Sequence, residues 1–267
     1  MKRWIYAAVL ALASTLACAI DEKAADDLLQ QTANTDAINT LKQLAGHGDK
    51  VAQDRLGLAY LSGHGIGKDP IAGKDWLQKA ADQGYAVSQA RLGFIYERGV
   101  GVQKDLTQAI SWYEKAAEQG NVAASFNLGQ LYSAGEDIPK DEIAAAKWFR
   151  VAAEREFVEA QLNLGVLYMG EALKKDYAEA FRWLSKAADA GNAKAMFNVG
   201  LMYQNGWGAK QDDAAALAWY RRAADGGYFW AAGNISQAYR DGTLGLKQDK
   251  EKADEWYRKF INMQLKR

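Results

Sequence analysis

Small and apolar residues recur along this chain at intervals of three and four, the spacing of one face of an α-helix. Ala160, Leu164 and Tyr168, for example, fall on one such face. Gly170 follows them, where a helix can end in the left-handed conformation that glycine accepts readily. Only two prolines occur in 267 residues, so few positions would interrupt helices. The pattern predicts a chain built from short amphipathic helices.

A second kind of segment alternates with the first and carries a tryptophan. Ala109 and Trp112 lie at helical spacing within one such segment, and Gly120 closes it. Asp105 stands just before these positions, where an aspartate can accept hydrogen bonds from the free N–H groups of a first helical turn. The stretch "GVGVQKD" between two segments predicts a loop. Each pair of segments therefore predicts a helix, a loop and a second helix.

The two kinds of segment return together at a fixed period. The tyrosines of the first segments are 35 or 36 residues apart, at Tyr60, Tyr96, Tyr132, Tyr168, Tyr203 and Tyr239. The tryptophans of the second segments are 35 to 37 residues apart, at Trp76, Trp112, Trp148, Trp183, Trp219 and Trp256. A fixed period of this length indicates stacked helix pairs, because neither helix of a pair can bury its apolar face alone. We interpret these six tryptophans as core residues rather than as a surface for sugars or bases.

The repeated pattern resembles the Sel1-like repeat family, relatives of tetratricopeptide repeats with a longer loop between the helices. The resemblance is carried by A-x-x-N-L-G-x-x-Y-x-x-G, a glycine-rich loop that ends in Asp, and A-x-x-W-x-x-K-A-A-x-x-G. These elements recur over about residues 36–262, as six repeats and a half. The resemblance implies an all-α fold, a right-handed α-solenoid of stacked helix-turn-helix repeats.

The N-terminal end differs from the repeats, as the end of an array should. "TLKQLAGHGD" at residues 40–49 aligns with the tryptophan segment and predicts a degenerate second helix, with a further helix over residues 22–33. We assign residues 20–50 to N-terminal capping helices and residues 51–267 to six repeats with a C-terminal cap.

Several positions depart from the pattern. Phe260 and Ile261 replace the paired alanines of the last second segment, where they are expected to cover the open end of the array. Glu156 replaces a helix-closing glycine, Ser236 replaces the glycine of Leu-Gly, and the loop "MGEALKKD" lacks a second glycine. We expect these departures to change loop conformation and helix spacing locally, without dividing the array into domains.

The first nineteen residues have the composition of a secretory signal. Two basic residues precede an apolar run, and the small residues at positions 17–19 fit cleavage after Ala19. Acylation at Cys18 is the alternative, although Thr15 stands where lipoprotein signals prefer leucine. Cleavage would leave 31 basic residues, 33 acidic residues and no cysteine, so no disulfide could stabilise the fold. We predict a periplasmic or secreted protein with no membrane insertion after cleavage.

Composition and motifs give little support for an enzyme or a bound cofactor. The 33 basic residues are balanced by 33 acidic ones, whereas nucleic-acid binders usually show a basic excess. His47 and His64 are the only histidines, too few for a zinc site in a mature chain without cysteine. The motifs S-x-x-K and G-x-S-x-G of serine enzymes do not occur. We predict no catalysis, no cofactor, no metal and no nucleic acid as a partner.

The family resemblance implies that the partner is another protein. Sel1-like repeats mostly form scaffolds and adaptors, and in bacteria they often have secreted or periplasmic partners. We predict a periplasmic adaptor in envelope assembly or signalling, which binds its partner on the concave face formed by the first helices. Two alternatives stay open: an immunity protein that neutralises a secreted phospholipase-type toxin and, with less support, a β-lactam-binding hydrolase. The family branch linked to β-lactams carries paired cysteines, which this chain lacks.

The candidate contact residues form a ladder with one position per repeat. The residue before Leu-Gly, or before its equivalent, is arginine or asparagine, at Arg55, Arg91, Asn127, Asn163, Asn198 and Asn234. Amides can hydrogen-bond a peptide backbone, and arginine can hold a carboxylate with two hydrogen bonds. The alternative is that the asparagines bond within and between helices. If the arginines serve a partner, replacing both with Ala should weaken binding and leave stability nearly unchanged.

Two tryptophans lie outside the repeat pattern. Trp207 is in a loop, and Trp230 begins the sixth first helix, where the other repeats carry different residues. One interpretation is local packing, of Trp207 against the next loop and of Trp230 against the C-terminal cap. The other is that one or both are exposed anchors for the partner, because tryptophan is enriched among binding hot spots.

Overall fold

The computed structural model describes residues 35–265, and this part of the chain contains helices and loops without a β-strand. The first helices of the six repeats are α4 (Lys50–Ser62), α6 (Ala86–Arg98), α8 (Val122–Ala134), α10 (Val158–Tyr168), α12 (Ala193–Asn205) and α14 (Phe229–Asp241). The second helices are α5 (Pro70–Asp82), α7 (Leu106–Glu118), α9 (Glu142–Ala153), α11 (Tyr177–Asp189), α13 (Asp213–Asp225) and α15 (Lys250–Leu265). The prediction of an all-α fold of repeated helix pairs is confirmed.

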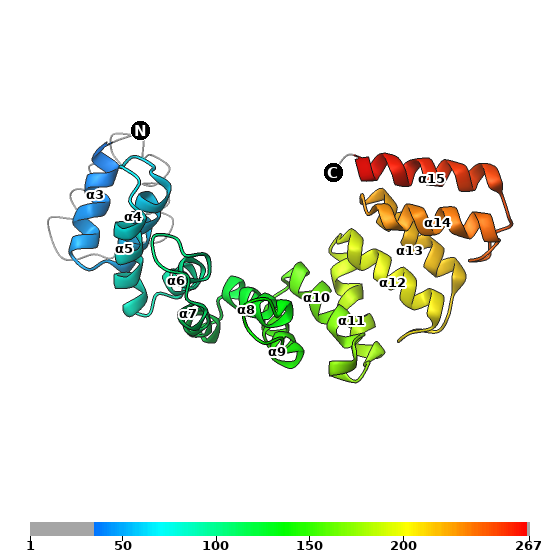
Figure 1. Cartoon of the computed structure of the whole chain (residues 1–267), viewed down its shortest axis with the longest axis horizontal. Coiled ribbons are helices and arrows are strands. Elements are labelled where there is room, and N and C mark those ends of the chain that lie inside the picture. Colours follow the sequence, from blue (N-terminus) through cyan, green and yellow to red (C-terminus); the bar gives the residue numbers. More distant parts are fainter. Residues whose placement is uncertain (1–34, 266–267) are drawn as a thin grey trace, which may run out of the picture. The chain divides into compact units, whose positions relative to one another are not determined.

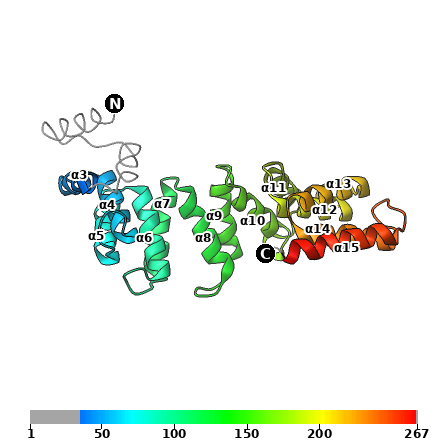
Figure 2. The same ribbon diagram turned by 90° about the horizontal axis from the view of Figure 1, so that it is seen from above.

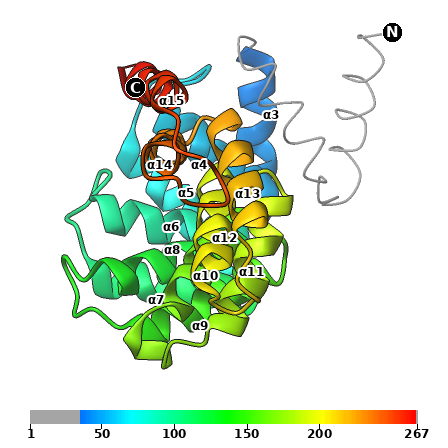
Figure 3. The ribbon, with the colours of Figure 1, turned by 90° about the vertical axis from the view of Figure 1, so that its right-hand side faces the viewer.

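The chain forms two compact units, and the boundary lies between Leu128 and Gly129, within α8 and not at Glu156. In the first unit, each helix from α3 (Thr35–Gly46) to α7 packs against the next one along the chain (Figures 1 and 2). In the second unit, the same holds for each helix from α9 to α15, and Figure 3 shows α15 beside α14. Consecutive helices within each unit therefore form stacked pairs. No helix among residues 35–265 combines the length and the apolar character needed to cross a membrane.

Aspartate side chains fix the start of the second helices, as the sequence predicted. Asp69 accepts hydrogen bonds from the backbone N–H groups of Ile71 (3.1 Å) and Ala72 (3.0 Å). Asp105 accepts one from Gln108 at 3.0 Å. The same cap occurs at Asp141, Asp176, Asp212 and Asp249. Each bond satisfies a donor that has no partner within its own helix, which places the helix start at the same point of every repeat.

The glycine of each Leu-Gly pair allows the two helices of a repeat to touch. A β-carbon at Gly57 would lie 2.7 Å from Leu77 Cγ and 2.9 Å from the carbonyl oxygen of Gly73. A β-carbon at Gly200 would lie 2.7 Å from the ring of Tyr220. Real β-carbons do not approach other atoms so closely, so a larger residue at either position would push the helices apart.

Ser236 stands at this position in the sixth repeat, and the local change that the sequence predicted is present. Its hydroxyl donates a 2.7 Å hydrogen bond to the carbonyl oxygen of Ala253, across the pair α14 and α15. Tyr257, which corresponds to the buried Tyr220 of the fifth repeat, is half exposed. The helices of this repeat therefore stay together through a hydrogen bond in place of a close apolar contact.

The six repeat tryptophans are less uniformly buried than predicted. Trp112, Trp148 and Trp183 are buried, whereas Trp76, Trp219 and Trp256 are half-buried. In repeats one to five the residue that follows each tryptophan is almost fully enclosed: Leu77, Tyr113, Phe149, Leu184 and Tyr220. These residues pack onto the glycines of the first helices. The interpretation of the tryptophans as core residues is confirmed for three of them and holds in part for the others.

A basic side chain lies over the indole ring in every repeat. Lys79 places its ammonium group 3.8 Å from the ring centroid of Trp76, and the same arrangement occurs at the other tryptophans that a basic residue follows by three positions. In the third repeat Val151 stands at that position, and Lys147 lies 4.6 Å from the ring of Trp148 instead. The basic residue of the repeat pattern therefore covers the outer side of the tryptophan by a cation–π contact.

Gly170 does not have the left-handed conformation predicted for it. Its φ is −87°, and the positive φ angles of this loop belong to Lys174 and Lys175. The reason is one missing residue, because Gly170 follows Tyr168 by two positions whereas Gly63 follows Tyr60 by three. The glycine therefore comes one residue before the point where the other helices close. The chain continues instead through a short 3-10 helix, η1 (Glu171–Leu173).

The two ends of the described chain are covered by atypical elements. At the N-terminal end, Ile38 and Leu41 of α3 pack with Ala52 and Leu56 of α4. The predicted helix over residues 22–33 and the signal at residues 1–19 lie outside the described residues. At the other end, Phe260 of α15 packs on α14, as expected for the C-terminal cap.

Glu156 keeps the backbone conformation of the glycine that it replaces. Its φ is +63°, and Gly84 and Gly120 have φ angles of +78° and +87° at the equivalent positions. A residue with a β-carbon is strained in this region, whereas glycine is not.

We expect Glu156→Gly to raise the free energy of unfolding by about 0.5–1 kcal/mol, because relief of the strain exceeds the added entropy of the unfolded chain. Urea denaturation of the two proteins measures the difference. Gly84→Ala is the matched control: a β-carbon there has no neighbour within 4 Å, so the substitution should lower stability through strain alone. Equal stability of Glu156→Gly and the unchanged protein would show that the third repeat does not store this strain.

Candidate functional site

The first two ladder positions belong to an ion-paired cluster around Asp54. This carboxylate is 0% exposed and lies on α4. Arg55 donates to Asp54 Oδ2 at 2.5 Å, and Arg91 of α6 donates to the same oxygen. Ser88 donates to Asp54 Oδ1 at 2.7 Å. Because α4 and α6 belong to neighbouring repeats, the cluster joins the first repeat to the second.

The arginines therefore hold a carboxylate of this chain. Arg55 is 6% exposed, while the Arg91 side chain is 29% exposed and remains accessible at one edge. A buried carboxylate that loses its ion-pair partners destabilises the folded protein. Removing both arginines is therefore expected to lower the stability, in contrast to the expectation from the sequence. The sequence feature that could have indicated this cluster is Asp54 itself, because the other repeats have Ala, Phe, Leu or Gly at this position.

Asn127 lies beside a tyrosine of the preceding repeat. The hydroxyl of Tyr113 donates a 2.8 Å hydrogen bond to Glu97 Oε2, and the Asn127 side chain interacts with the same hydroxyl. Burial, followed by the bond to Glu97, raises the pKa of Tyr113 far above its ordinary value. The hydroxyl therefore stays protonated and connects a first helix, the second helix of the same repeat and the first helix of the next.

Asn234 takes part in an equivalent arrangement in the second unit. Tyr220 donates a 2.6 Å hydrogen bond to Gln204 Oε1, and the Asn234 side chain interacts with the Tyr220 hydroxyl. Burial raises the pKa of Tyr220 to about 12, and the interaction with Asn234 opposes this increase. Asn127 and Asn234 thus contact neighbouring repeats, which agrees with the interpretation that ladder asparagines bond between helices.

Asn163 and Asn198 differ from these two asparagines in what precedes them. Both are half-buried, on α10 and α12. The preceding second helices carry Phe149 and Leu184 where Tyr113 and Tyr220 stand elsewhere. Neither amide therefore has a tyrosine hydroxyl to bond at that position. Both amides keep hydrogen-bond donors and acceptors for other groups.

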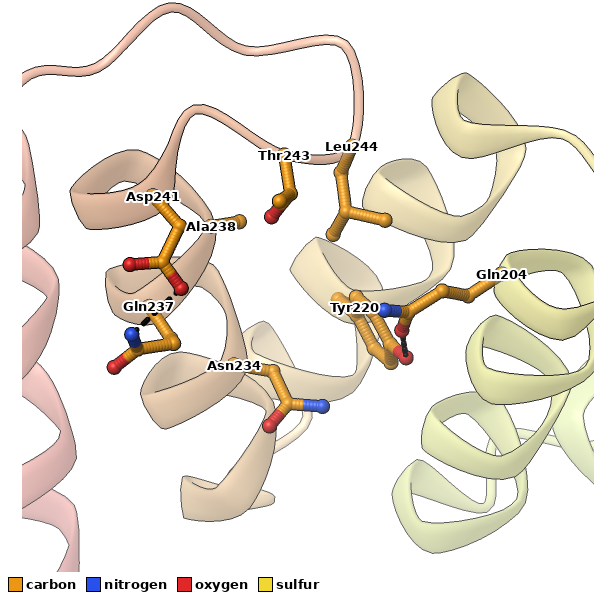
Figure 4. A pocket seen from close by; sticks show the side chains of 8 residues that line it. All are labelled: Gln204, Tyr220, Asn234, Gln237, Ala238, Asp241, Thr243 and Leu244. Atoms are coloured by element: carbon orange, nitrogen blue, oxygen red, sulfur yellow. Dashed lines mark hydrogen bonds between the residues drawn. The ribbon is translucent and has the colours of Figure 1, made fainter.

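A polar pocket lies next to Asn234, in the sixth repeat (Figure 4). This sixth-repeat pocket has a volume of about 250 Å³. Its lining residues come from α12, α13, α14 and the loop after α14: Gln204, Tyr220, Asn234, Gln237, Ala238, Asp241, Thr243 and Leu244. Gln237 donates a 2.7 Å hydrogen bond to Asp241 Oδ2 across one helical turn. The pocket therefore contains one carboxylate and several amide and hydroxyl groups.

An unusual loop forms one wall of this pocket. The loop from Gly242 to Asp249 is one residue longer than the loop from Gly206 to Asp212 in the fifth repeat. Leu244 stands where that loop has Gly208, and it keeps a positive φ of +55°. A β-carbon at Gly208 would overlap the backbone of Tyr177, whereas the Leu244 side chain is accommodated and buried. The longer loop thus leaves room for a side chain, which points in the direction of Tyr220 (Figure 4).

The two tryptophans outside the repeat pattern have different surroundings. Trp207 is half-buried and stacks on Tyr177, with ring centroids 5.3 Å apart and ring planes at 6°. It therefore packs on the preceding repeat and not on the next loop. Trp230 lies 5.9 Å from Phe260 of the C-terminal cap, as one interpretation expected, and is still 52% exposed.

No three His, Cys, Asp or Glu side chains come together as possible metal ligands within residues 35–265. Of the two histidines, His47 forms a hydrogen bond of 2.8 Å with the carbonyl oxygen of Gln43 at the end of α3. The polar groups that sequence reasoning missed are Asp54, Gln237 and Asp241. The signal for the last two was a glutamine and an aspartate four residues apart on the sixth first helix, where the fifth repeat has Leu201 and Asn205.

The comparisons with known proteins agree with the repeat pattern. The family model of the Sel1 repeat matches residues 50–85, 86–121, 122–157, 158–192, 193–228 and 230–264. Among solved structures, c5321, a protective antigen of uropathogenic Escherichia coli strains with an SLR fold, is 32% identical over 85% of this chain, with a TM-score of 0.80. This chain spans about half of that protein, 49% of its length.

A Sel1 repeat protein from Oxalobacter formigenes is 30% identical over 90% of this chain and 96% of its own, with a TM-score of 0.70. The immunity protein Pa5087 from Pseudomonas aeruginosa is 21% identical over 72% of this chain and 73% of its own, with a TM-score of 0.43. That likeness is too weak to bear on the function of this chain. A search of the curated proteins gives no match.

We expect Arg55→Met to lower the free energy of unfolding by about 3 kcal/mol, because it leaves the buried Asp54 carboxylate with one basic partner fewer. Methionine keeps most of the apolar stem, so the loss reports the charge pair rather than a cavity. Urea denaturation measures it, with Arg98→Met as the control. Arg98 is exposed and its ion pair is with the neighbouring Glu97, so its removal should change stability by less than about 0.5 kcal/mol. If the two substitutions had equal effects, the buried pair of Arg55 and Asp54 would not stabilise the fold.

Proposed function

We propose that this chain, which belongs to the Sel1 repeat family, is a scaffold that binds a partner protein on the polar faces of its first helices. Sel1 repeats mediate protein–protein interaction and are generally non-catalytic. The leader-like first nineteen residues support a periplasmic or secreted location for this activity. An adaptor role in envelope assembly or signalling is the form of the proposal that we prefer.

The observation that carries the proposal is the pair of ladder amides at Asn163 and Asn198. They lie at the same position of two consecutive first helices, α10 and α12, and neither has a tyrosine hydroxyl at the position that holds Asn127 and Asn234. An amide side chain can donate to a peptide carbonyl and accept from a peptide N–H at the same time. Two such groups, one repeat apart, suit an extended segment of a partner.

Exposed apolar side chains lie beside the ladder in each of the two units. Val166 is exposed three residues after Asn163 on α10, and Phe94 is exposed three residues after Arg91 on α6. Residues three apart lie on one side of a helix, so each apolar side chain is a neighbour of its ladder residue. Arg98 adds a cation 5.8 Å from the ring of Phe94. Polar ladder groups next to exposed apolar groups are the composition expected of a protein-binding face.

Affinity capture from periplasmic extract tests the proposed function, with identification of the bound protein. Capture of an envelope or signalling component that binds the purified protein directly would support the adaptor role. Capture of a secreted toxin whose activity the protein abolishes would assign the immunity role instead. Hydrolysis of a substrate by the purified protein would contradict the non-catalytic part of the proposal.

We expect Asn163→Ala and Asn198→Ala each to weaken binding of the captured partner by about 0.5–1.5 kcal/mol, the net value of a hydrogen bond. Isothermal titration measures affinity, and thermal melting confirms that the variants fold. Asn262→Ala, at an exposed position of the second helix α15, is the matched control and should leave affinity unchanged. Unaltered affinity of both ladder variants would remove these amides from the contact surface.

Trp230 and Trp207 are expected to respond in opposite ways. Trp230→Ala should weaken partner binding by about 2 kcal/mol if this exposed ring is an anchor, with a small effect on melting. Trp207→Ala should lower the free energy of unfolding by about 1 kcal/mol, because it removes the stack on Tyr177. Both quantities are measured for both variants. A loss of stability without loss of affinity at Trp230 would assign that residue to the C-terminal cap alone.

A further inference from the structure

We propose that the sixth-repeat pocket binds the guanidinium group of an arginine side chain. The proposal rests on the proposed function for the source of that arginine, which would be the partner protein. The chemistry of the pocket can be tested without a partner.

Several polar groups of the pocket offer hydrogen-bond acceptors beside the donors of its amides. Asp241 uses Oδ2 to accept from Gln237, and its other carboxylate oxygen has no hydrogen-bond partner among the described residues. Because Gln237 donates through its amide nitrogen, its amide oxygen stays open to a donor. The hydroxyl oxygen of Thr243 also points into the pocket (Figure 4). None of the eight lining residues is basic, so the carboxylate is the only ionised group among them.

A guanidinium group complements these acceptors with donors alone. It carries five N–H donors in a plane and has no acceptor, so it can bond a carboxylate and an amide oxygen from different edges. A lysine ammonium has three donors on a single atom and would reach fewer of these oxygens from one position. Arginine is therefore the side chain that we assign to the pocket.

The size and the walls of the pocket suit a single side chain. Its volume of about 250 Å³ is below the range of about 300–1,000 Å³ that is typical of drug-sized ligands. Ala238 and Leu244 provide apolar contacts for the methylene stem of an arginine. Leu244 reaches the pocket because of the longer loop of the sixth repeat, and it is held by its burial despite a positive φ.

The glutamine–aspartate pair of the pocket is specific to this repeat. Gln237 and Asp241 correspond to Leu201 and Asn205 in the fifth repeat, and to Gln130 and Ala134 in the third. Neither of those repeats has a carboxylate at the second position. The repeat pattern therefore does not account for Asp241, and Gln130 provides a matched position at which the pocket chemistry is missing.

The test uses N-acetyl-arginine-N-methylamide as the probe, titrated into the full protein and followed by the side-chain amide resonances of Gln237 and Asn234. The corresponding citrulline derivative has nearly the same shape without the charge, and the lysine derivative has the charge without the planar group. We expect saturable chemical-shift changes with the arginine probe. The affinity for the citrulline probe should be lower by about tenfold or more. Asp241→Asn should lower affinity for the arginine probe by a similar factor.

Gln237→Lys provides a second variant, because its ammonium group would lie one turn from Asp241 and occupy the pocket. It should abolish binding of the arginine probe, while Gln130→Lys, the same change in the third repeat, should leave binding unchanged. Thermal melting checks that all variants fold. Equal affinity for the arginine and citrulline probes, or no saturable shift, would overturn the proposal, and equal affinity for the lysine probe would overturn the assignment to arginine.

The same variants separate this inference from the proposed function. Partner affinity that falls with Gln237→Lys and not with Asn262→Lys, at an exposed position of the second helix α15, would support arginine recognition within the partner complex. Probe binding together with unchanged partner affinity would overturn the assignment of the arginine to the partner. Failure to find any partner would contradict the proposed function and leave the probe measurements valid.

Discussion

The contact between the two helices of a repeat depends on one position without a side chain. The glycine of each Leu-Gly pair lets the residue after the tryptophan lie directly on the first helix, at distances that no β-carbon allows. This contact fixes the spacing of the pair, and it places the ladder residue, two positions earlier, next to the neighbouring repeat. In the sixth repeat a hydrogen bond from Ser236 to the carbonyl oxygen of Ala253 joins the two helices instead.

The polar groups between repeats follow from this arrangement. Where the enclosed residue is tyrosine, its hydroxyl reaches the edge of the pair and meets the ladder asparagine of the next repeat, as at Tyr113 and Tyr220. Where it is phenylalanine or leucine, the asparagine is left for other partners. The Asp54 cluster joins the first two repeats with charges instead. At the asparagine positions of the ladder, the residue after the preceding tryptophan therefore decides whether a tyrosine hydroxyl is present to bond the amide.

Most of the fold could be predicted from the sequence, because the period, the N-cap aspartates and the glycines act locally and recur in register. Gly170 was predicted wrongly because its conformation depends on the count of residues from Tyr168, which one deletion changes. The site was less predictable. The pairing of Arg55 and Arg91 with Asp54 joins residues of two repeats. The sixth-repeat pocket depends on the direction of the Leu244 side chain. Neither follows from a pattern within one repeat.

The extra residue in the loop after α14 has a consequence for how such a repeat array evolves. The insertion lies between two helices that still pack on each other, with Asp249 still at the start of α15. A loop can therefore gain or lose a residue without altering the register of the helices around it. Each repeat combines a helix pair whose close contacts permit few substitutions with a loop that can vary more freely. New recognition chemistry can arise in the connection of one repeat while its neighbours keep their sequence.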